Sequence, residues 1–211
     1  MVMRRMLSRF RRDEDGVVLV EGLLSMPIVI LMMIAMVECG MLLFQWNLTV
    51  KALQIGARLA AVSEPVVGQT AYDTLTNDYG ALIEGDPVPN AIVTVSCGAG
   101  ASPCDATQLN RLMTGGDACG TTTFGAPTGI CDMARFINPD NLRISYHRAG
   151  LGYVGRPFGV VTTITVELRN QYFDFIFLDA ILPDLFGGIN IPAHPVTITS
   201  EDLSDCTTTC I

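Results

Sequence analysis

The chain has few of the residues from which catalytic sites are built. Its 211 residues include only two histidines, His147 and His194, and neither lies in a motif with a serine or cysteine nucleophile. No GxSxG, HExxH or Walker-type motif is present, and the Gly-rich stretch 98–102 lacks the lysine of a phosphate loop. No CxxC pair is present either, which argues against zinc. We therefore expect no catalytic residue, no bound metal and no cofactor.

Basic residues are scarce beyond the N-terminus. The first sixteen positions hold five arginines and three acidic residues, so subtraction from the 13 basic and 21 acidic residues of the chain leaves 8 and 18. The remainder therefore carries a net charge of about −10. Nucleic-acid binding needs cationic patches that meet phosphates. The composition thus argues against a nucleic-acid partner.

Charge is also missing from a long apolar run near the N-terminus. The run extends over 17–44, and no charged residue occurs from Gly22 to Val37. As a helix, its roughly 28 residues measure about 42 Å, whereas about 20 residues suffice to cross a bilayer. The five arginines before the run predict that the N-terminus stays in the cytoplasm and that the rest is exported. A lipid bilayer is therefore an expected partner.

The cysteines are consistent with export into an oxidising compartment. One of the seven, Cys39, lies inside the apolar run, and the other six follow it. An even number of cysteines in an exported region predicts disulfides. Six cysteines allow fifteen pairings. We favour the three local ones, Cys97 with Cys104, Cys119 with Cys131, and Cys206 with Cys210.

The chain is expected to have three parts and an α+β fold. Residues 1–16 form a basic cytoplasmic leader, 17–62 a continuous helix before Pro65, with its membrane part at about 17–44, and 63–211 an exported α+β domain. In that domain, alternation of apolar and polar side chains predicts an antiparallel sheet with strands at 91–97, 141–147, 159–172 and 194–201. The other predicted segments are a short helix at 71–83, a disulfide-held loop region at 97–131, and either an amphipathic helix or an apolar loop at 173–187.

Small residues recur at four-residue spacing near the end of the expected long helix. They are Ala52, Gly56 and Ala60. Such a stripe lets another element approach the helix backbone closely. The partner is either the globular part of the same chain or another subunit.

The N-terminus is typical of one kind of processing site. A secretory signal has a shorter apolar region than the run at 17–44, followed by a small-residue cleavage site. A bacterial lipoprotein has a small residue directly before its acceptor cysteine, whereas Cys39 follows Glu38. Neither pattern fits. The remaining interpretation is cleavage on the cytoplasmic side, before the apolar run and after Gly16.

Gly16, the four apolar residues 17–20 and Glu21 resemble a type IV prepilin processing site. The longer resemblance, over about residues 9–62, is to TadE-like pseudopilins of the tight adherence (Tad/Flp) pilus system. These proteins and this chain have in common a basic leader and a Pro-containing apolar helix with an acidic residue and a glycine late in it, here 37–40. The helix ends in both in a stretch like A-x-x-x-G-A-R-x-A, here 52–61. The major pilins of this system are very short, so the large body of this chain favours a minor pseudopilin.

The resemblance implies a structural protein that is not an enzyme. A prepilin peptidase would cut between Gly16 and Val17, and the product would remain in the bacterial inner membrane with its body in the periplasm. Its partners would be other pilins or pseudopilins and an inner-membrane assembly platform. The alternative function is an uncleaved single-pass anchor whose periplasmic body binds a partner.

Glu21 is the expected assembly residue. An unpaired carboxylate in the apolar layer costs on the order of 2.5–3.5 kcal/mol on insertion scales. Cleavage would give Val17 an α-amino group, with a reference pKa of about 7.7–8.0, and so offer Glu21 a cationic partner in its own or an adjacent subunit. The alternative is that Glu21 lies at the level of the lipid headgroups.

Overall fold

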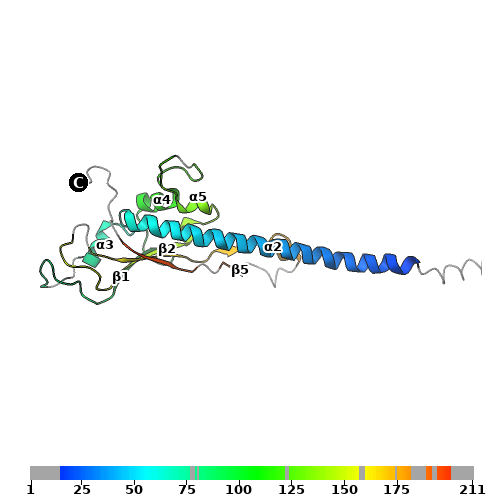
Figure 1. Ribbon diagram of the computed structural model, residues 1–211, viewed down its shortest axis with the longest axis horizontal. Coiled ribbons are helices and arrows are strands. Elements are labelled where there is room, and N and C mark those ends of the chain that lie inside the picture. The colour runs from blue at the N-terminus through cyan, green and yellow to red at the C-terminus, as the bar shows by residue number, and fades with distance from the viewer. Residues whose placement is uncertain are drawn as a thin grey trace, which may run out of the picture. The chain divides into compact units, whose positions relative to one another are not determined.

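The computed structural model describes residues 15–76, 79, 81–121, 124–156, 160–173, 175–181, 189–191 and 194–200. Figure 1 shows the arrangement of the elements. They are, in chain order, α2 (Asp15–Val62), α3 (Gln69–Thr76), β1 (Val93–Gly98), α4 (Ala106–Thr114), α5 (Ile130–Met133), the 3-10 turn η1 (Pro139–Asn141), β2 (Leu142–Arg148), β3 (Thr163–Leu168), β4 (Tyr172–Phe173), α6 (Leu178–Ile181), β5 (Ile189–Asn190) and β6 (Val196–Thr199).

The chain forms two compact units. The first consists of Met1–Leu43 and Asp174–Gly188, and the second of Phe44–Phe173 and Ile189–Ile211. The first unit therefore combines the apolar part of α2 with the segment that contains α6. The second contains the last turns of α2, both sheets and the remaining helices.

Helix α2 has almost the bounds that the sequence predicts. It extends over 48 residues, about 72 Å at about 1.5 Å per residue, and continues through Pro27. Among the described residues it is the one helix long and apolar enough to cross a membrane. Nearly all of its side chains from Leu19 to Leu43 are exposed in the isolated chain, which suits a helix that anchors the protein in a bilayer.

An antiparallel sheet in the order β1-β2-β3-β6 dominates the second unit, so the predicted α+β fold class is confirmed. Strand β3 alternates between buried and half-buried residues, and its buried Ile164 and Val166 pair with Tyr146 and Ile144 of β2. These apolar residues share one core with Leu53, Ala57 and other residues in the last turns of α2. That part of α2 lies against one face of the sheet, on the side that α4 and α5 also occupy (Figure 1).

The opposite face of this sheet is polar. Cross-strand hydrogen bonds join Thr94 to His147, Ser96 to Ser145 and Thr165 to Thr197, at 2.9, 2.9 and 3.2 Å. Because successive side chains in a strand point to opposite faces, the alternation that predicted the strands also separates this polar face from the core.

The prediction that 97–131 is a loop region held by disulfides was wrong in part: the disulfides are present, but helix α4 lies within the region. Helix α4 forms there because Asp105 caps it: the Asp105 carboxylate accepts hydrogen bonds from the backbone N–H groups of Thr107 and Gln108, at 2.9 and 3.0 Å. Gly115 ends the helix in the left-handed conformation, with a φ of 70°. The first two residues of helix α5, Ile130 and Cys131, also lie within the predicted loop region. Local capping chemistry therefore outweighed a composition rich in Gly and Thr.

Two other predicted boundaries were wrong in detail. The helix expected at 71–83 corresponds to α3 and ends at Thr76. The strand expected at 159–172 is shorter, because β3 covers only Thr163–Leu168, and Tyr172 belongs to the two-stranded sheet of β4 and β5. Of the segment 173–187, the described residues include the short helix α6.

Candidate functional site on the N-terminal helix

The backbone at the expected cleavage position is helical. Gly16 and Val17 lie in the first turn of α2. Residues 1–14, which make up most of the expected basic leader, lie outside the described residues. A cut at this position would make the first turn of α2 the N-terminus of the mature chain.

Glu21 lies on an exposed and otherwise apolar stretch of α2. Its neighbours Val20 and Leu24 are 55% and 68% exposed, and Glu21 itself is exposed. No partner for its carboxylate is found among the residues that the structure describes. An exposed carboxylate one turn from the expected new N-terminus is available to a cationic partner.

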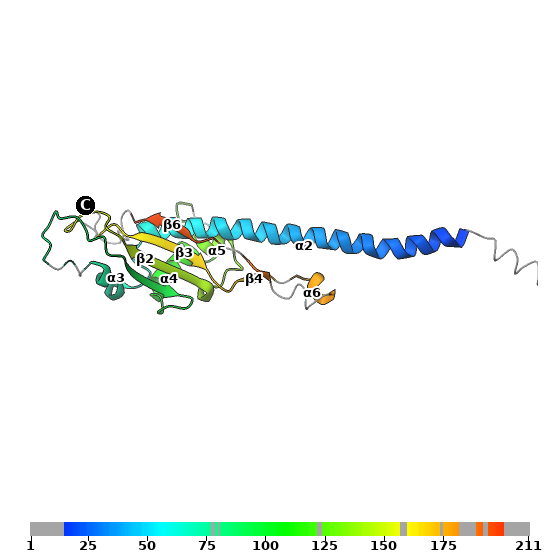
Figure 2. The same ribbon diagram turned by 90° about the horizontal axis from the view of Figure 1, so that it is seen from below.

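Glu38, in contrast, is buried and held by hydrogen bonds. The residue is only 3% exposed. The backbone N–H of Phe177 donates to Oε1 at 2.5 Å, and that of Leu178 donates to Oε2 at 3.1 Å. Leu178 is the first residue of the short helix α6, which Figure 2 shows near α2 in this unit, and Phe177 directly precedes it. Sequence reasoning assigned no contact to Glu38, because its partners are 139 and 140 residues away.

The small-residue stripe near the end of α2 lies inside the second unit. Ala52 and Ala60 are fully buried, and Gly56 is buried beside α5. A Cβ at Gly56 would lie 2.6 Å from Cδ1 of Ile130, closer than carbon atoms normally approach. Glycine at this position therefore permits close packing of α2 against α5 of the same chain.

Among the described residues of the second unit, two disulfides are formed, Cys97–Cys104 and Cys119–Cys131. They match two of the local pairs favoured above. The third expected pair, Cys206 with Cys210, lies outside the described residues. Cys39 is exposed and forms no disulfide with any other cysteine that the structure describes.

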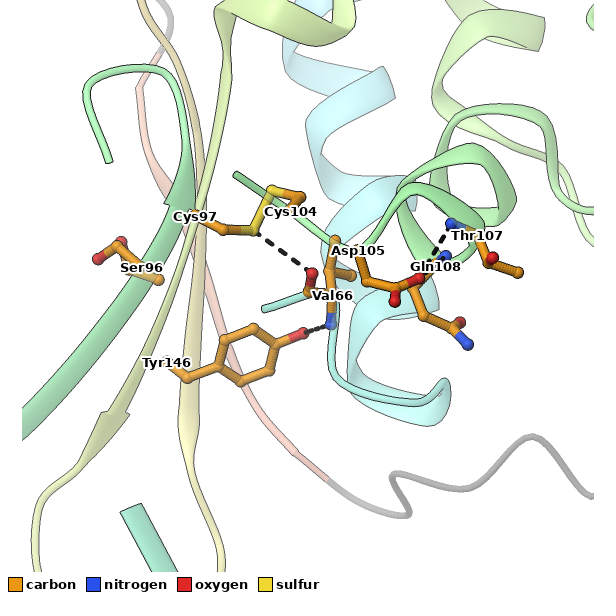
Figure 3. Close-up of a disulfide and its surroundings, with 9 residues drawn as sticks. Val66, Ser96, Cys97, Cys104, Asp105, Thr107, Gln108 and Tyr146 are labelled. Atoms are coloured by element: carbon orange, nitrogen blue, oxygen red, sulfur yellow. Dashed lines mark hydrogen bonds between the residues drawn. A yellow bond between two sulfur atoms is a disulfide. The ribbon is translucent and has the colours of Figure 1, made fainter. Parts of the chain in front are cut away.

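The Cys97–Cys104 bridge stands beside a junction of three elements (Figure 3). The backbone of Val66, just after α2, accepts a hydrogen bond from the N–H of Asp105 at 2.9 Å and donates one to the Tyr146 hydroxyl at 3.0 Å. Cys97 Sγ lies 3.5 Å from the Val66 carbonyl oxygen, a van der Waals contact, because a disulfide sulfur carries no proton. The chain leaving α2 is thereby fixed to both β2 and the start of α4.

The two histidines are placed in ordinary structural surroundings. Nδ1 of His147 lies 2.9 Å from the Thr94 hydroxyl on the polar face of the sheet, and His194 is exposed. Within the described part of the chain, one cluster holds metal-type ligand atoms, Cys119, Cys131 and Asp132. Its two sulfurs are joined in a disulfide, so the cluster offers a single carboxylate.

Comparison with known proteins finds one similarity, in the N-terminal part of the chain. Residues 16–58 match the family model described as TadE-like protein. No curated protein and no solved structure matches the chain. The matched segment starts at Gly16 and includes Glu21, Glu38 and Gly56. Residues 16–58 of this chain are therefore similar to TadE-like proteins.

Proposed function

We propose that the chain is a minor pseudopilin, a membrane-anchored structural component of a Tad-type pilus or a related secretion apparatus. The observation that carries this proposal is the match of residues 16–58 to TadE-like proteins, which begins at the expected cleavage residue, Gly16. The exposed apolar surface of α2 and the absence of any charge from Gly22 to Val37 support membrane insertion. The acidic body, which follows the membrane segment, would face the periplasm.

A prepilin peptidase removes the leader between Gly16 and Val17 in this account. The cut takes away the five arginines that hold the N-terminus in the cytoplasm and leaves an α-amino group on Val17. That nitrogen lies about 6 Å before Glu21 along the helix axis, and positions four residues apart share one face of a helix. Cleavage therefore places a cation and an anion on the same face of the mature helix.

Glu21 is the assembly residue in this account. Its carboxylate would pair with the Val17 amine of its own or a neighbouring subunit as helices come together. Pairing offsets the cost of holding a carboxylate in the apolar layer, and so favours one register between packed helices. The partners are other pilins or pseudopilins and the assembly platform of the inner membrane.

The Glu21→Gln variant tests this role. The variant should lose its leader as the wild type does, because Gly16 is unchanged, but its amount in sheared pili or assembly complexes should fall at least several-fold. Ser25→Ala is the matched control, since Ser25 lies one turn further on and its hydroxyl donates only to the Gly22 carbonyl of the same helix, at 3.3 Å. Normal incorporation of Glu21→Gln would contradict the assembly role. Retention of the leader on the wild-type chain would instead favour an uncleaved anchor.

A further inference from the structure

The first unit contains a second apolar surface beside α2. We call residues 175–180 the α6 segment. Two exposed residues in it, Ile176 and Phe177, at 65% and 55% exposure, lie between two buried ones, Phe175 and Leu178, at 5% and 8%. Two adjacent large apolar side chains are therefore displayed although two others nearby are packed. Burial of a protein core does not account for the exposed pair.

This segment covers the one charge in the middle of α2. From Gly22 to Val50, Glu38 is the only charged residue. The N–H groups of Phe177 and Leu178 bind its two carboxylate oxygens, and the residue is left only 3% exposed. The neighbouring helix residues Met36 and Val37 remain 77% and 64% exposed. The contact thus turns a helix surface interrupted by a carboxylate into a continuous apolar one.

The same contact satisfies the backbone at the start of α6. The first N–H groups of a helix have no partner within it, and in hydrocarbon each unsatisfied group costs several kcal/mol. Glu38 provides acceptors for two N–H groups here. A segment tied down in this way is compatible with an apolar medium.

The position of Glu38 along α2 gives the depth of the segment. Glu38 follows Val17 by 21 residues, about 32 Å at about 1.5 Å per residue, and the hydrocarbon core of a bilayer is about 30 Å thick. If the helix enters the core near Val17, Glu38 and the α6 segment lie at its far boundary. Asp179, which is half-buried in α6, suits this boundary and not the centre of the bilayer.

We propose that the α6 segment is a second membrane-contacting element, which Glu38 holds against α2 so that Ile176 and Phe177 enter the acyl region of the outer half of the bilayer. The lipid surface is favoured as the occupant because the exposed pair continues the apolar surface of α2 at the level where that helix leaves the core. The proposal rests on insertion of α2 and is independent of leader cleavage and of pilus assembly.

A fluorescence reporter at position 177 tests the proposal. Trp46 is the only tryptophan, so the full-length chain with Trp46→Phe and Phe177→Trp carries a single emitter. The protein is reconstituted in phosphatidylcholine vesicles that carry bromine either near the headgroup or near the end of the acyl chain. We expect strong quenching by the lipids brominated near the headgroup, and little by aqueous iodide. A chain with Trp46→Phe and Met36→Trp, without Phe177→Trp, is the reference for a position on the apolar helix itself.

Adding Glu38→Ala should release the segment, lower the lipid quenching several-fold and raise the quenching by iodide. Glu21→Ala is the matched control, because it also removes a carboxylate from α2. Glu21 contacts none of the described residues of the α6 segment, so this variant should leave the quenching unchanged. If Phe177→Trp disturbs the fold, Ile176→Trp reports on the same surface. Quenching by iodide instead of lipid would overturn the proposal. Shielding from both quenchers would also overturn it, and would indicate a protein partner such as a second copy of the chain.

Discussion

Glu21 and Glu38 lie on the same apolar helix in different surroundings. Glu21 is exposed among exposed apolar neighbours, and its carboxylate is available to a partner outside the subunit. Glu38 is buried and already accepts two backbone N–H groups from the same unit. Hydrogen bonds to a charged group each contribute about 1.5–3 kcal/mol. Loss of Glu38 should therefore change the subunit itself, whereas loss of Glu21 should change what the subunit joins.

Tyr146 provides a residue-scale prediction for alkaline pH. Burial raises the pKa of Tyr146 well above its ordinary value of about 10, so the folded chain keeps the phenol proton where the unfolded chain loses it. The stabilisation is complete below about pH 10 and is lost as the pH rises from there towards the folded-state pKa. Unfolding of the detergent-solubilised chain, followed by near-UV circular dichroism, should show stability falling above about pH 10.

Tyr146→Phe should reduce this alkaline slope. At neutral pH the variant should lose about 1–3 kcal/mol, since the buried N–H of Val66 loses its acceptor. Part of the slope should persist, because burial also raises the pKa of Tyr72. Tyr153→Phe, at a side chain 47% exposed, is the control and should leave the slope unchanged. An unchanged slope in Tyr146→Phe would contradict this assignment.

At the scale of elements, the contact between α2 and α5 depends on Gly56. Gly56→Val should destabilise the second unit by about 1–3 kcal/mol, the usual cost of overpacking, because Ile130 is fully buried and its Cδ1 would lie 2.6 Å from the new Cβ. Adding Ile130→Val removes that atom and leaves only Cγ1, which would lie 2.8 Å from the new Cβ, so the double variant should be more stable than the sum of the two single changes indicates. Denaturant unfolding measures both values.

Gly40→Val is the control for helix propensity, because a Cβ at Gly40 meets nothing within 4 Å. It should leave the stability of the second unit within about 0.5 kcal/mol of the wild type. Strict additivity between Gly56→Val and Ile130→Val would show that the close approach to Ile130 is not what requires glycine.

The elements differ in how far the sequence could predict them. Helix α2 and strands β2 and β3 were predictable because apolar run length and period-two alternation are local signals that packing then preserves. Helix α4 was missed although its signal is local: Asp105, Gln108 three residues later and Gly115 form a start and a stop. The hydrogen bonds from α6 to Glu38 could not be predicted, because they join residues 139 and 140 positions apart.

At the scale of the whole molecule, the two units differ in structure. The first presents the apolar helix with its two carboxylates, and the match to TadE-like proteins covers nearly all of α2. The second packs the last turns of α2 into a core with an antiparallel sheet and two disulfides. Disulfides of this kind are typical of exported domains, which agrees with a body outside the cytoplasm.

The mass of the mature chain tests the central claim most directly. The protein isolated from the membranes of cells that contain a prepilin peptidase should begin at Val17, by intact mass and N-terminal sequencing. Gly16→Leu should keep residues 1–16 and be absent from pili, because its side chain blocks the approach of the protease to the backbone. A wild-type chain that retains residues 1–16 in such cells, or normal pilus incorporation of uncut Gly16→Leu, would contradict the account.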